Sequence, residues 1–514
     1  MDKVKSFLKK QIQDRVPPSV LISSSKIPQS PFGAFPSQED FYRYRKQRGV
    51  NLGSWFVLEP WLTDVPYRNA VPPAESDHDV ARGLDAKSTL EQHWDTWIVE
   101  EDWKWIAEHG FNSVRIPIGF YHLCGANAAV LDGTDFADLY DVFSGAWKRI
   151  TCAIETAHRY GIGVLIDLHA APGKQNADSH SGTSSSNVAF FEQANLKRTA
   201  SILASLLRQL VTYTHTHNPP LPNLIGIELV NEPRPPQPHN FFHDWYRFLI
   251  SALRNIDPEL PLYVSDSWRE HDYAGMLVSA DNSFPGFLDD HAQSAEQHAA
   301  ALRGEGGTPA VFQQVNRMMT PVGAGLVVGE WSAALNPASL RDVSDPHAAQ
   351  RTFVDAQLEL YERECAGWFF WTYRKQWPGD TGWCMRDAVG AGVFPPYVGL
   401  RKTRVDSEDG GWTRRRDKAK REALEQHTAY WKKYPGQYEH WRFEEGYLQG
   451  WEDAYMFFSS STTIVAEIGF KTAWIKRRID MHAQRKGLIK NLWEYGHGLQ
   501  QGMDAAKADY LLLL

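Results

Sequence analysis

The stretch Ile225-Gly226-Ile227-Glu228-Leu229-Val230-Asn231-Glu232-Pro233 decides how the rest of the chain is interpreted. Its first part is a short apolar run bounded by turn residues, which is typical of a buried parallel strand. The polar pair Asn231-Glu232 follows where that strand would run out into a loop, which is the place where α/β barrels keep their chemistry. We therefore expect a barrel strand with a functional glutamate at its carboxyl end.

A second acid has the same setting in Leu326-Val327-Val328-Gly329-Glu330-Trp331. One glutamate at a strand end commonly caps a helix or meets an arginine, so a single acid of this kind indicates little. Two of them, accompanied by further polar strand ends, favour a pair of catalytic carboxylates, Glu232 and Glu330.

Eight apolar runs alternate with helix-length amphipathic patterns between residues 41 and 400. The alternation predicts an α/β fold of the (β/α)8 or TIM-barrel type, with its active site at the carboxyl ends of the strands. The runs lie at 49–52, 113–116, 163–168, 224–229, 262–265, 286–289, 326–329 and 367–371. The polar or aromatic residues within or after them are Arg115, His169, Asn231, Glu232, His291, Glu330 and Trp371. Because a barrel interior is otherwise filled with Val, Ile and Leu, packing alone explains these residues poorly.

Two flanking segments differ from the barrel region in composition. Residues 1–40 begin with an amphipathic pattern and continue into a Pro/Ser-rich stretch, which predicts a short helix and a linker. Residues 401–514 predict a basic loop, including Arg401, Lys402, Arg404 and Arg414 to Arg416, followed by a helical extension. In the extension, 441–450 and 493–502 form a weak repeat with Trp, aromatic, Gly, Gln and Gly in register, and small residues at helical spacing let helices approach closely.

Composition restricts the class of protein. Hydrophobic residues make up 43% and charged residues 23% of the 514 residues, and no apolar stretch approaches the ~20 residues of a membrane helix. A net charge of -8 argues against nucleic acid as a partner, whereas 20 Trp, 20 Tyr and 25 Phe supply flat apolar surfaces that suit a carbohydrate. Four widely spaced cysteines predict neither a disulfide framework nor a zinc knuckle.

The first ten residues lack the apolar core of a secretory signal, so we expect a cytoplasmic protein. A mitochondrial presequence is the minority alternative, weakened by Asp2, Asp14 and the scarcity of Arg. A second copy or a protein partner would bind, if at all, through the C-terminal helices.

With these residues in view, the chain resembles glycoside hydrolase family 5, and most closely its fungal exo-β-1,3-glucanase-like branch. The resemblance runs from about Arg48 to Pro396. It rests on an ordered set of motifs: 48–60 (RGVNLGSWFVLEP), 90–94 (LEQHW), 114–119 (VRIPIG), 167–173 (DLHAAPG), 230–233 (VNEP), 329–332 (GEWS) and 367–372 (GWFFWT).

The resemblance implies a retaining β-glucosidase in which Glu232 is the acid/base and Glu330 the nucleophile, with no metal and no organic cofactor. Arg115 would keep the nucleophile charged, and Asn231 would hold the sugar 2-hydroxyl. His169 and His291 would orient substrate and carboxylates. Glu59 would accept hydrogen bonds from the terminal glucose, and Trp371 would form the floor of that subsite.

The chain departs from the family pattern at two places. After the sixth strand, Gln293 stands where the family has a tyrosine that hydrogen-bonds the nucleophile. After the third, Asp178 falls where the glucanases carry an aromatic residue that clamps the next sugar. The aglycone side is therefore expected to suit something other than a linear β-1,3-glucan.

Two hypotheses follow. The first is an enzyme that hydrolyses terminal β-D-glucosyl linkages, β-1,3 among them, in glucans, oligosaccharides or glucosides by a two-glutamate double displacement. The alternative is a non-catalytic or weakly active barrel that binds glucosides or a protein partner. Hydrolysis of a chromogenic β-glucoside separates the two.

Overall fold

The computed structural model describes residues 36–278, 284–285, 302, 308–341, 343–401, 411–461, 464–486 and 490–513. The chain forms two compact units. The barrel unit contains Gln47–Met318 and Leu326–Val398, and the C-terminal unit contains Gly399–Leu514 together with Tyr44–Lys46 and Met319–Gly325. The predicted N-terminal helix and most of the predicted linker lie outside the described residues.

The barrel unit is built on one sheet of eight strands, all paired in parallel. The strands are β1 (Gln47–Asn51), β2 (Ser113–Gly119), β3 (Gly163–Ala170), β4 (Leu224–Glu228), β5 (Leu262–Val264), β6 (Phe284–Pro285), β7 (Val327–Trp331) and β8 (Gly367–Phe370). Their order is β6-β5-β4-β3-β2-β1-β8-β7. Because the first strand pairs with the last, the sheet curls around on itself as a (β/α)8 barrel does, which confirms the predicted fold class. The predicted run 286–289 lies outside the described residues.

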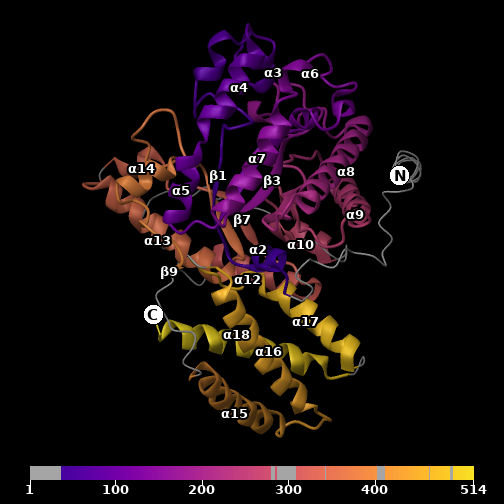
Figure 1. Cartoon of the computed structure of the whole chain (residues 1–514), viewed down its shortest axis with the longest axis vertical. Helices are drawn as coiled ribbons and strands as arrows, with labels where there is room; N and C mark the ends of the chain where they lie inside the picture. Colours follow the sequence, from indigo (N-terminus) through magenta and orange to yellow (C-terminus); the bar gives the residue numbers. More distant parts are fainter. Residues whose placement is uncertain are drawn as a thin grey trace. The chain divides into compact units, whose positions relative to one another are not determined.

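Helices follow the strands and cover the sheet (Figure 1). The α-helices of this part of the chain are α2 (Gln38–Tyr44), α3 (Asp77–Ala81), α4 (Ala86–Trp97), α5 (Glu100–Glu108), α6 (Tyr140–Phe143), α7 (Ala146–Arg159), α8 (Gln193–Thr216), α9 (Asn240–Arg254), α10 (Glu270–Val278), α12 (Thr308–Met319), α13 (Pro346–Glu364) and α14 (Met385–Gly390). Short 3-10 turns lie at η1 (Val65–Asn69), η2 (Phe120–Leu123), η3 (Ala128–Leu131), η4 (Ser179–Ser181), η5 (Thr320–Val322) and η6 (Pro337–Leu340).

The apolar patterns of the sequence correspond to buried faces. On α7, Ile150, Ile154 and Ala157 are fully buried, as their helical spacing predicts. Every residue of β2 and β3 is buried, which explains why these strands are continuous apolar runs rather than alternating ones. The polar exceptions inside those runs, Arg115 and Asp167, are buried too and need internal partners.

The C-terminal unit is helical. It consists of β9 (Leu400–Arg401), α15 (Gly411–Trp431), α16 (His440–Ser459), β10 (Ile464–Val465), α17 (Lys471–Lys486) and α18 (Leu492–Leu511). The repeat noted in the sequence forms the contact between α16 and α18. A Cβ atom on Gly446 or Gly450 would run into the backbone of α18, and one on Gly498 or Gly502 would run into that of α16. The small residues therefore allow the close helix approach that the repeat predicts.

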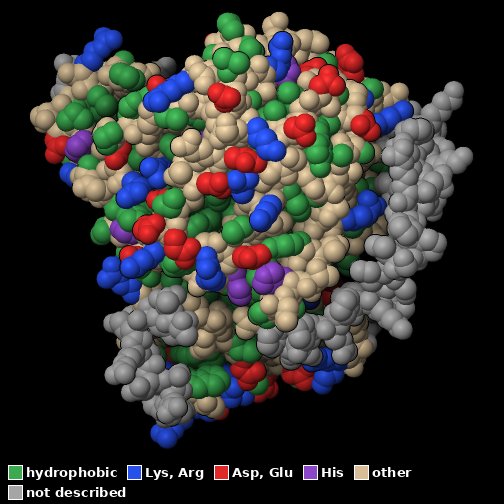
Figure 2. Space-filling view, turned by 45° about the horizontal axis from the view of Figure 1, so that its top comes forward, with side chains coloured by type: hydrophobic (Ala, Val, Ile, Leu, Met, Phe, Trp, Pro, Cys, Tyr) green, Lys and Arg blue, Asp and Glu red, His purple; other side chains and the backbone are tan. Residues whose placement is uncertain are grey.

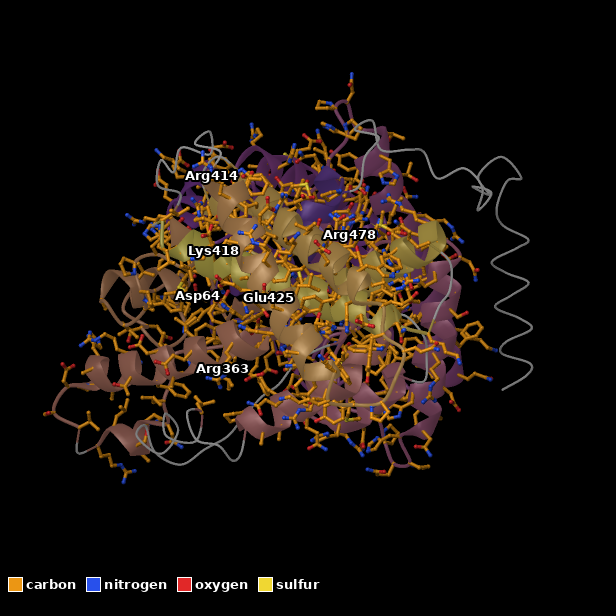
Figure 3. The ribbon with its side chains drawn as sticks, turned by 90° about the horizontal axis from the view of Figure 1, so that it is seen from below. Asp64, Arg363, Arg414, Lys418, Glu425 and Arg478 are labelled. Carbon is orange, nitrogen blue, oxygen red and sulfur yellow. The ribbon has the colours of Figure 1, made fainter. Side chains whose placement is uncertain are left out.

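Part of the predicted basic loop is helical, because Arg414 to Arg416 lie on α15, whereas Lys402 and Arg404 lie outside the described residues. Figure 3 labels Arg414, Lys418 and Glu425 on this helix and Arg478 on α17. Arg415 pairs with Asp509, and Arg416 pairs with Glu452. These ion pairs to α18 and α16 give Arg415 and Arg416 partners within the unit.

Three further observations bear on the class of protein. All four cysteines are free, with Cys152 exposed and the other three buried. Within the described ranges, no helix combines the length and the apolar character that crossing a lipid bilayer requires. Acidic and basic side chains are interspersed over the face seen in Figure 2.

Candidate active site

Arg115 is the centre of the polar cluster at the carboxyl ends of the barrel strands. It extends from β2, is fully buried, and has a partner at each of its three nitrogens. Its contacts are Glu228 Oε2 (2.8 Å from Nε), Asn51 Oδ1 (2.9 Å from Nη1), Glu330 Oε1 (2.8 Å from Nη1), Asn231 Oδ1 (2.9 Å from Nη2) and Asp167 Oδ2 (3.0 Å from Nη2). One guanidinium thus joins β1, β2, β3, β4 and β7.

The charges of this cluster do not balance. Arg115 faces three carboxyl groups, those of Asp167, Glu228 and Glu330. Burial raises the pKa of Asp167 to about 7 and those of Glu228 and Glu330 to about 8, and Arg115 only partly opposes it. Arg115 lowers the pKa of Glu330, which is the direction predicted from the sequence, whereas burial and the charges of Asp167, Glu228 and Glu59 raise it. Because these acids share one guanidinium, the ionisation of each acid affects the pKa of the other two.

His169 is held as a neutral ring on β3. Its Nδ1 lies 2.6 Å from Asp167 Oδ2, and its Nε2 lies 3.4 Å from the Asn231 side-chain nitrogen. Burial and the nearby Arg115 hold the pKa of His169 well below its usual value. The bond to the carboxylate therefore assigns the proton to Nδ1, which leaves Nε2 to accept from Asn231. The ring also lies parallel to that of Trp371 at 5.7 Å.

Glu232 follows β4 in a conformation that its surroundings impose. Its φ is +41°, in the left-handed region that non-glycine residues adopt only when neighbouring contacts require it. Its backbone N–H donates to Ser265 Oγ at 3.2 Å, and its carbonyl accepts from Asn176 Nδ2 at 3.1 Å. The carboxylate lies 3.7 Å from Nε2 of His180, whose pKa burial lowers to about 3. The two backbone hydrogen bonds, to Ser265 and from Asn176, hold Glu232 at the barrel mouth.

Glu59 lies in the loop after β1, and its two carboxyl oxygens differ in their contacts. Its Oε2 accepts from Trp61 Nε1 at 2.8 Å, whereas Oε1 is buried without a hydrogen-bond partner among the residues that the structure describes. Burial raises the pKa of this carboxyl to about 7, against the lowering effect of Trp61. An unpaired buried acceptor is costly unless a ligand supplies a donor. The geometry therefore fits the predicted role of accepting a substrate hydroxyl.

The flank beyond Glu232 contains Asp178, where the sequence predicts the loss of an aromatic residue. Asp178, which stands where the family has an aromatic residue, pairs with Arg234 at 3.4 Å. The Arg234 guanidinium lies over the ring of Trp268, 4.8 Å from its centroid. An aromatic ring is thus present, but it comes from the loop after β5 and is covered by a cation.

Most of the predicted site residues meet at one end of the barrel. Arg115 contacts Asn231 and Glu330, and His169 contacts Asn231 and Trp371. Glu59 and Glu232 stand at the same end, after β1 and β4. His291 and Gln293 lie outside the described residues, so their predicted roles stay predictions.

Sequence reasoning missed several residues of the site. They are Asn51, Asp167, Glu228, His180 and Trp268. The acids inside the apolar runs of β3 and β4 were a visible signal, because a buried charge needs a partner. His180 and Trp268 lie in loops, where no periodic pattern marks them.

Comparisons with known proteins show which family the chain belongs to. Residues 81–376 match the family model "Cellulase (glycosyl hydrolase family 5)", and residues 412–509 match "Glucan 1,3-beta-glucosidase 3 C-terminal domain". Among solved structures, rutinosidase from Aspergillus niger has a similar fold, with a TM-score of 0.53 and 17% identity over 69% of this chain and 99% of that one.

Curated relatives cover the chain more completely. Glucan 1,3-beta-glucosidase 3 of Schizosaccharomyces pombe is 29% identical over 91% of this chain and 96% of its own length. An uncharacterized glycosyl hydrolase of Saccharomyces cerevisiae is 28% identical over 94% of this chain and 95% of its own. The probable glucan 1,3-beta-glucosidase A of Aspergillus fumigatus is 30% identical over 68% of this chain and 87% of its own. With its family match spanning more than half of its length, the chain belongs to glycosyl hydrolase family 5 and is a glycoside hydrolase.

Proposed function

We propose that the protein is a retaining β-glucosidase that removes terminal β-D-glucosyl units, with a preference for β-1,3 linkages, from glucans, oligosaccharides or glucosides. The observation that carries the proposal is the pair of hydrogen bonds from Arg115 to Asn231 and to Glu330. These two hydrogen bonds connect the end of β4, which is followed by Glu232, with Glu330 on β7. The names of the relatives in fission yeast and Aspergillus fumigatus support the β-1,3 linkage.

The proposed reaction has two displacements. First, Glu330 attacks the anomeric carbon while Glu232 gives its proton to the glycosidic oxygen, so the bond to the aglycone breaks and a glucosyl ester forms. Then Glu232 takes a proton from water, whose oxygen attacks the anomeric carbon and releases Glu330. Both glutamates return to their starting states, and the product is β-glucose.

The supporting residues act on the sugar in the subsite of the terminal glucose. Asn231, oriented by Arg115 and His169, would bind the 2-hydroxyl, a contact that strengthens in the oxocarbenium-like transition state. Trp371, almost fully buried and parallel to His169, would lie against the ring. Glu59 would accept from a hydroxyl through its unpartnered Oε1.

The stereochemistry of hydrolysis tests the proposal. Proton NMR of an aryl β-glucoside digest should show β-glucose as the first product, whereas α-glucose first would mean inversion. Laminaribiose should be cleaved faster than cellobiose if the linkage is β-1,3. A folded protein that turns over no β-glucoside would instead support a non-catalytic barrel.

A further inference from the structure

A cavity of about 490 Å³ lies beside the loop that follows β8, outside the cluster around Arg115. It is lined by residues of that loop, by Ala334 and Leu335 after β7, and by Gln350 of α13. Its volume falls in the range of small-molecule sites. Two of its lining side chains, Trp377 and Trp383, are exposed to 44% and 40%, and large exposed aromatic surfaces commonly mark binding sites.

The lining loop is held in place by its own hydrogen bonds. Asp380 Oδ1 accepts from the backbone N–H groups of Gly382 and Trp383 at 3.1 and 3.0 Å. The carbonyl of Trp383 accepts from Thr372 N–H at 2.7 Å, which anchors the loop next to the end of β8. Because this loop is already held in place, little of its conformational entropy is lost when a ligand binds, which reduces the cost of binding.

The lining suits a neutral polar ligand. Among the described lining residues only Lys375 and Asp380 carry charge, and their side chains pair with each other at 2.7 Å. Thr381 and Gln350 add a hydroxyl and a carboxamide, joined by a 2.8 Å hydrogen bond. Flat indole faces beside hydroxyl and amide groups are the combination that binds a sugar ring, apolar on its face and polar on its edge.

Trp61 links the cavity to the catalytic end of the barrel and separates it from the glucose subsite. On one side its Nε1 donates to Glu59. On the other, its ring meets that of Trp383 edge-on at 5.7 Å, and Lys375 Nζ lies 4.5 Å from its centroid. A sugar in the cavity would therefore lie one side chain away from Glu59, outside the subsite of the terminal glucose.

We propose that this cavity is a second saccharide-binding site, which holds a neutral glucosyl unit of a further saccharide molecule while the terminal glucose of the substrate occupies the catalytic subsite. The loops that line it follow β7 and β8, which are neighbours in the strand order. Glu232 and Asp178 instead follow β4 and β3, which are separated from β8 by β2 and β1 in that order. The cavity therefore belongs to the flank away from the departing aglycone. The inference rests on the proposed function only for the identity of the sugar.

Calorimetric titration of Glu330→Gln with laminaritriose tests the proposal, because this variant should not consume the ligand. Saturating 1-deoxynojirimycin, a glucose mimic, blocks the catalytic subsite. Binding of laminaritriose should persist under this block and should weaken by about threefold to tenfold when Trp377→Ala is added. The control is Trp441→Ala, an equally large change at a tryptophan 40% exposed on α16, which should leave the binding unchanged.

A kinetic measurement on the otherwise unmodified protein completes the test. Trp377→Ala should leave kcat and KM for an aryl β-glucoside as they were, because this substrate does not extend into the cavity. No binding under the block, or equal binding by Trp377→Ala, would overturn the second site. If the protein did not hydrolyse an aryl β-glucoside, the proposed function would be overturned instead. Binding of laminaritriose in the presence of 1-deoxynojirimycin would still test the cavity in that case.

Discussion

Arg115 Nη1 lies 2.8 Å from Glu330 Oε1, yet the pKa of that glutamate is raised to about 8. Burial is the largest cause, and the negative charges of Asp167 and Glu228 add to it. The same guanidinium serves all three acids, so its attraction is divided. The candidate nucleophile therefore ionises as one member of a coupled group, and its neighbours determine the pH at which it can attack.

Replacing Glu228 should change that pH. Glu228→Gln removes a negative charge while its amide oxygen can still accept from Arg115 Nε, so the pKa of Glu330 should fall. The acidic limb of the kcat/KM profile for an aryl β-glucoside with a good leaving group should move to lower pH by about half a unit or more. A limb that stays in place or moves to higher pH would contradict the coupling.

The two glutamates should respond differently to the leaving group. Glu232→Gln should lower kcat/KM about 100-fold or more for laminaribiose but should spare dinitrophenyl β-glucoside, because only a poor leaving group needs a proton in the first step. Glu330→Gln should abolish turnover of both substrates. Steady-state kinetics on the pair measures this, and equal losses for Glu232→Gln on both would remove its assignment as the acid.

Glu59 should make stability depend on pH. Its pKa rises from 4.5 to about 7 on folding, so the folded state binds the proton more tightly than the unfolded state. Below pH 4.5 both states are protonated and the ionisation has no effect. Between pH 4.5 and 7 the unfolded chain ionises first, so stability falls as pH rises, by about 3 kcal/mol in total.

Glu59→Gln removes this penalty. Its apparent melting temperature should equal that of the parent near pH 4 and exceed it at pH 8, as scanning fluorimetry can measure. Lys375→Gln, which alters another side chain against Trp61, serves as the comparison. A gain for Glu59→Gln that is larger at pH 4 than at pH 8 would show that the carboxyl is not destabilised by burial.

The glycine contacts of the C-terminal unit make a separate prediction. A Cβ atom at Gly498 would run into the backbone oxygen of Phe443, whereas one at Gly496 meets the flexible end of Ile479. Gly498→Ala should therefore cost about 1–3 kcal/mol of stability by overpacking. Gly496→Ala, two residues away on α18, should be near neutral because alanine also favours the helix. Chemical denaturation followed by circular dichroism compares the two, and equal effects would exclude a close α16–α18 contact as the reason for the repeat.

The elements that could be predicted are those with a strong periodic signal. The apolar runs of β2, β3 and β4 and the buried face of α7 follow from burial on both sides of a parallel sheet and from helical spacing. The position of Arg414 to Arg416 was predicted incorrectly, because α15 buries little of its surface, with His427 as its buried residue, and its sequence therefore has no strong apolar periodicity.

The sequence by itself determined the barrel class and the identity of the acids at its carboxyl end, since residues that end parallel strands must gather at one edge. Only the tertiary structure decided how those residues interact. It placed three carboxyl groups around one guanidinium, so that their pKa values rise together. It also brought Trp61 from the first loop against Trp383 from the last. Electrostatic coupling and contacts between distant loops depend on distances in three dimensions. Local sequence patterns do not indicate these distances for residues that are far apart in the chain.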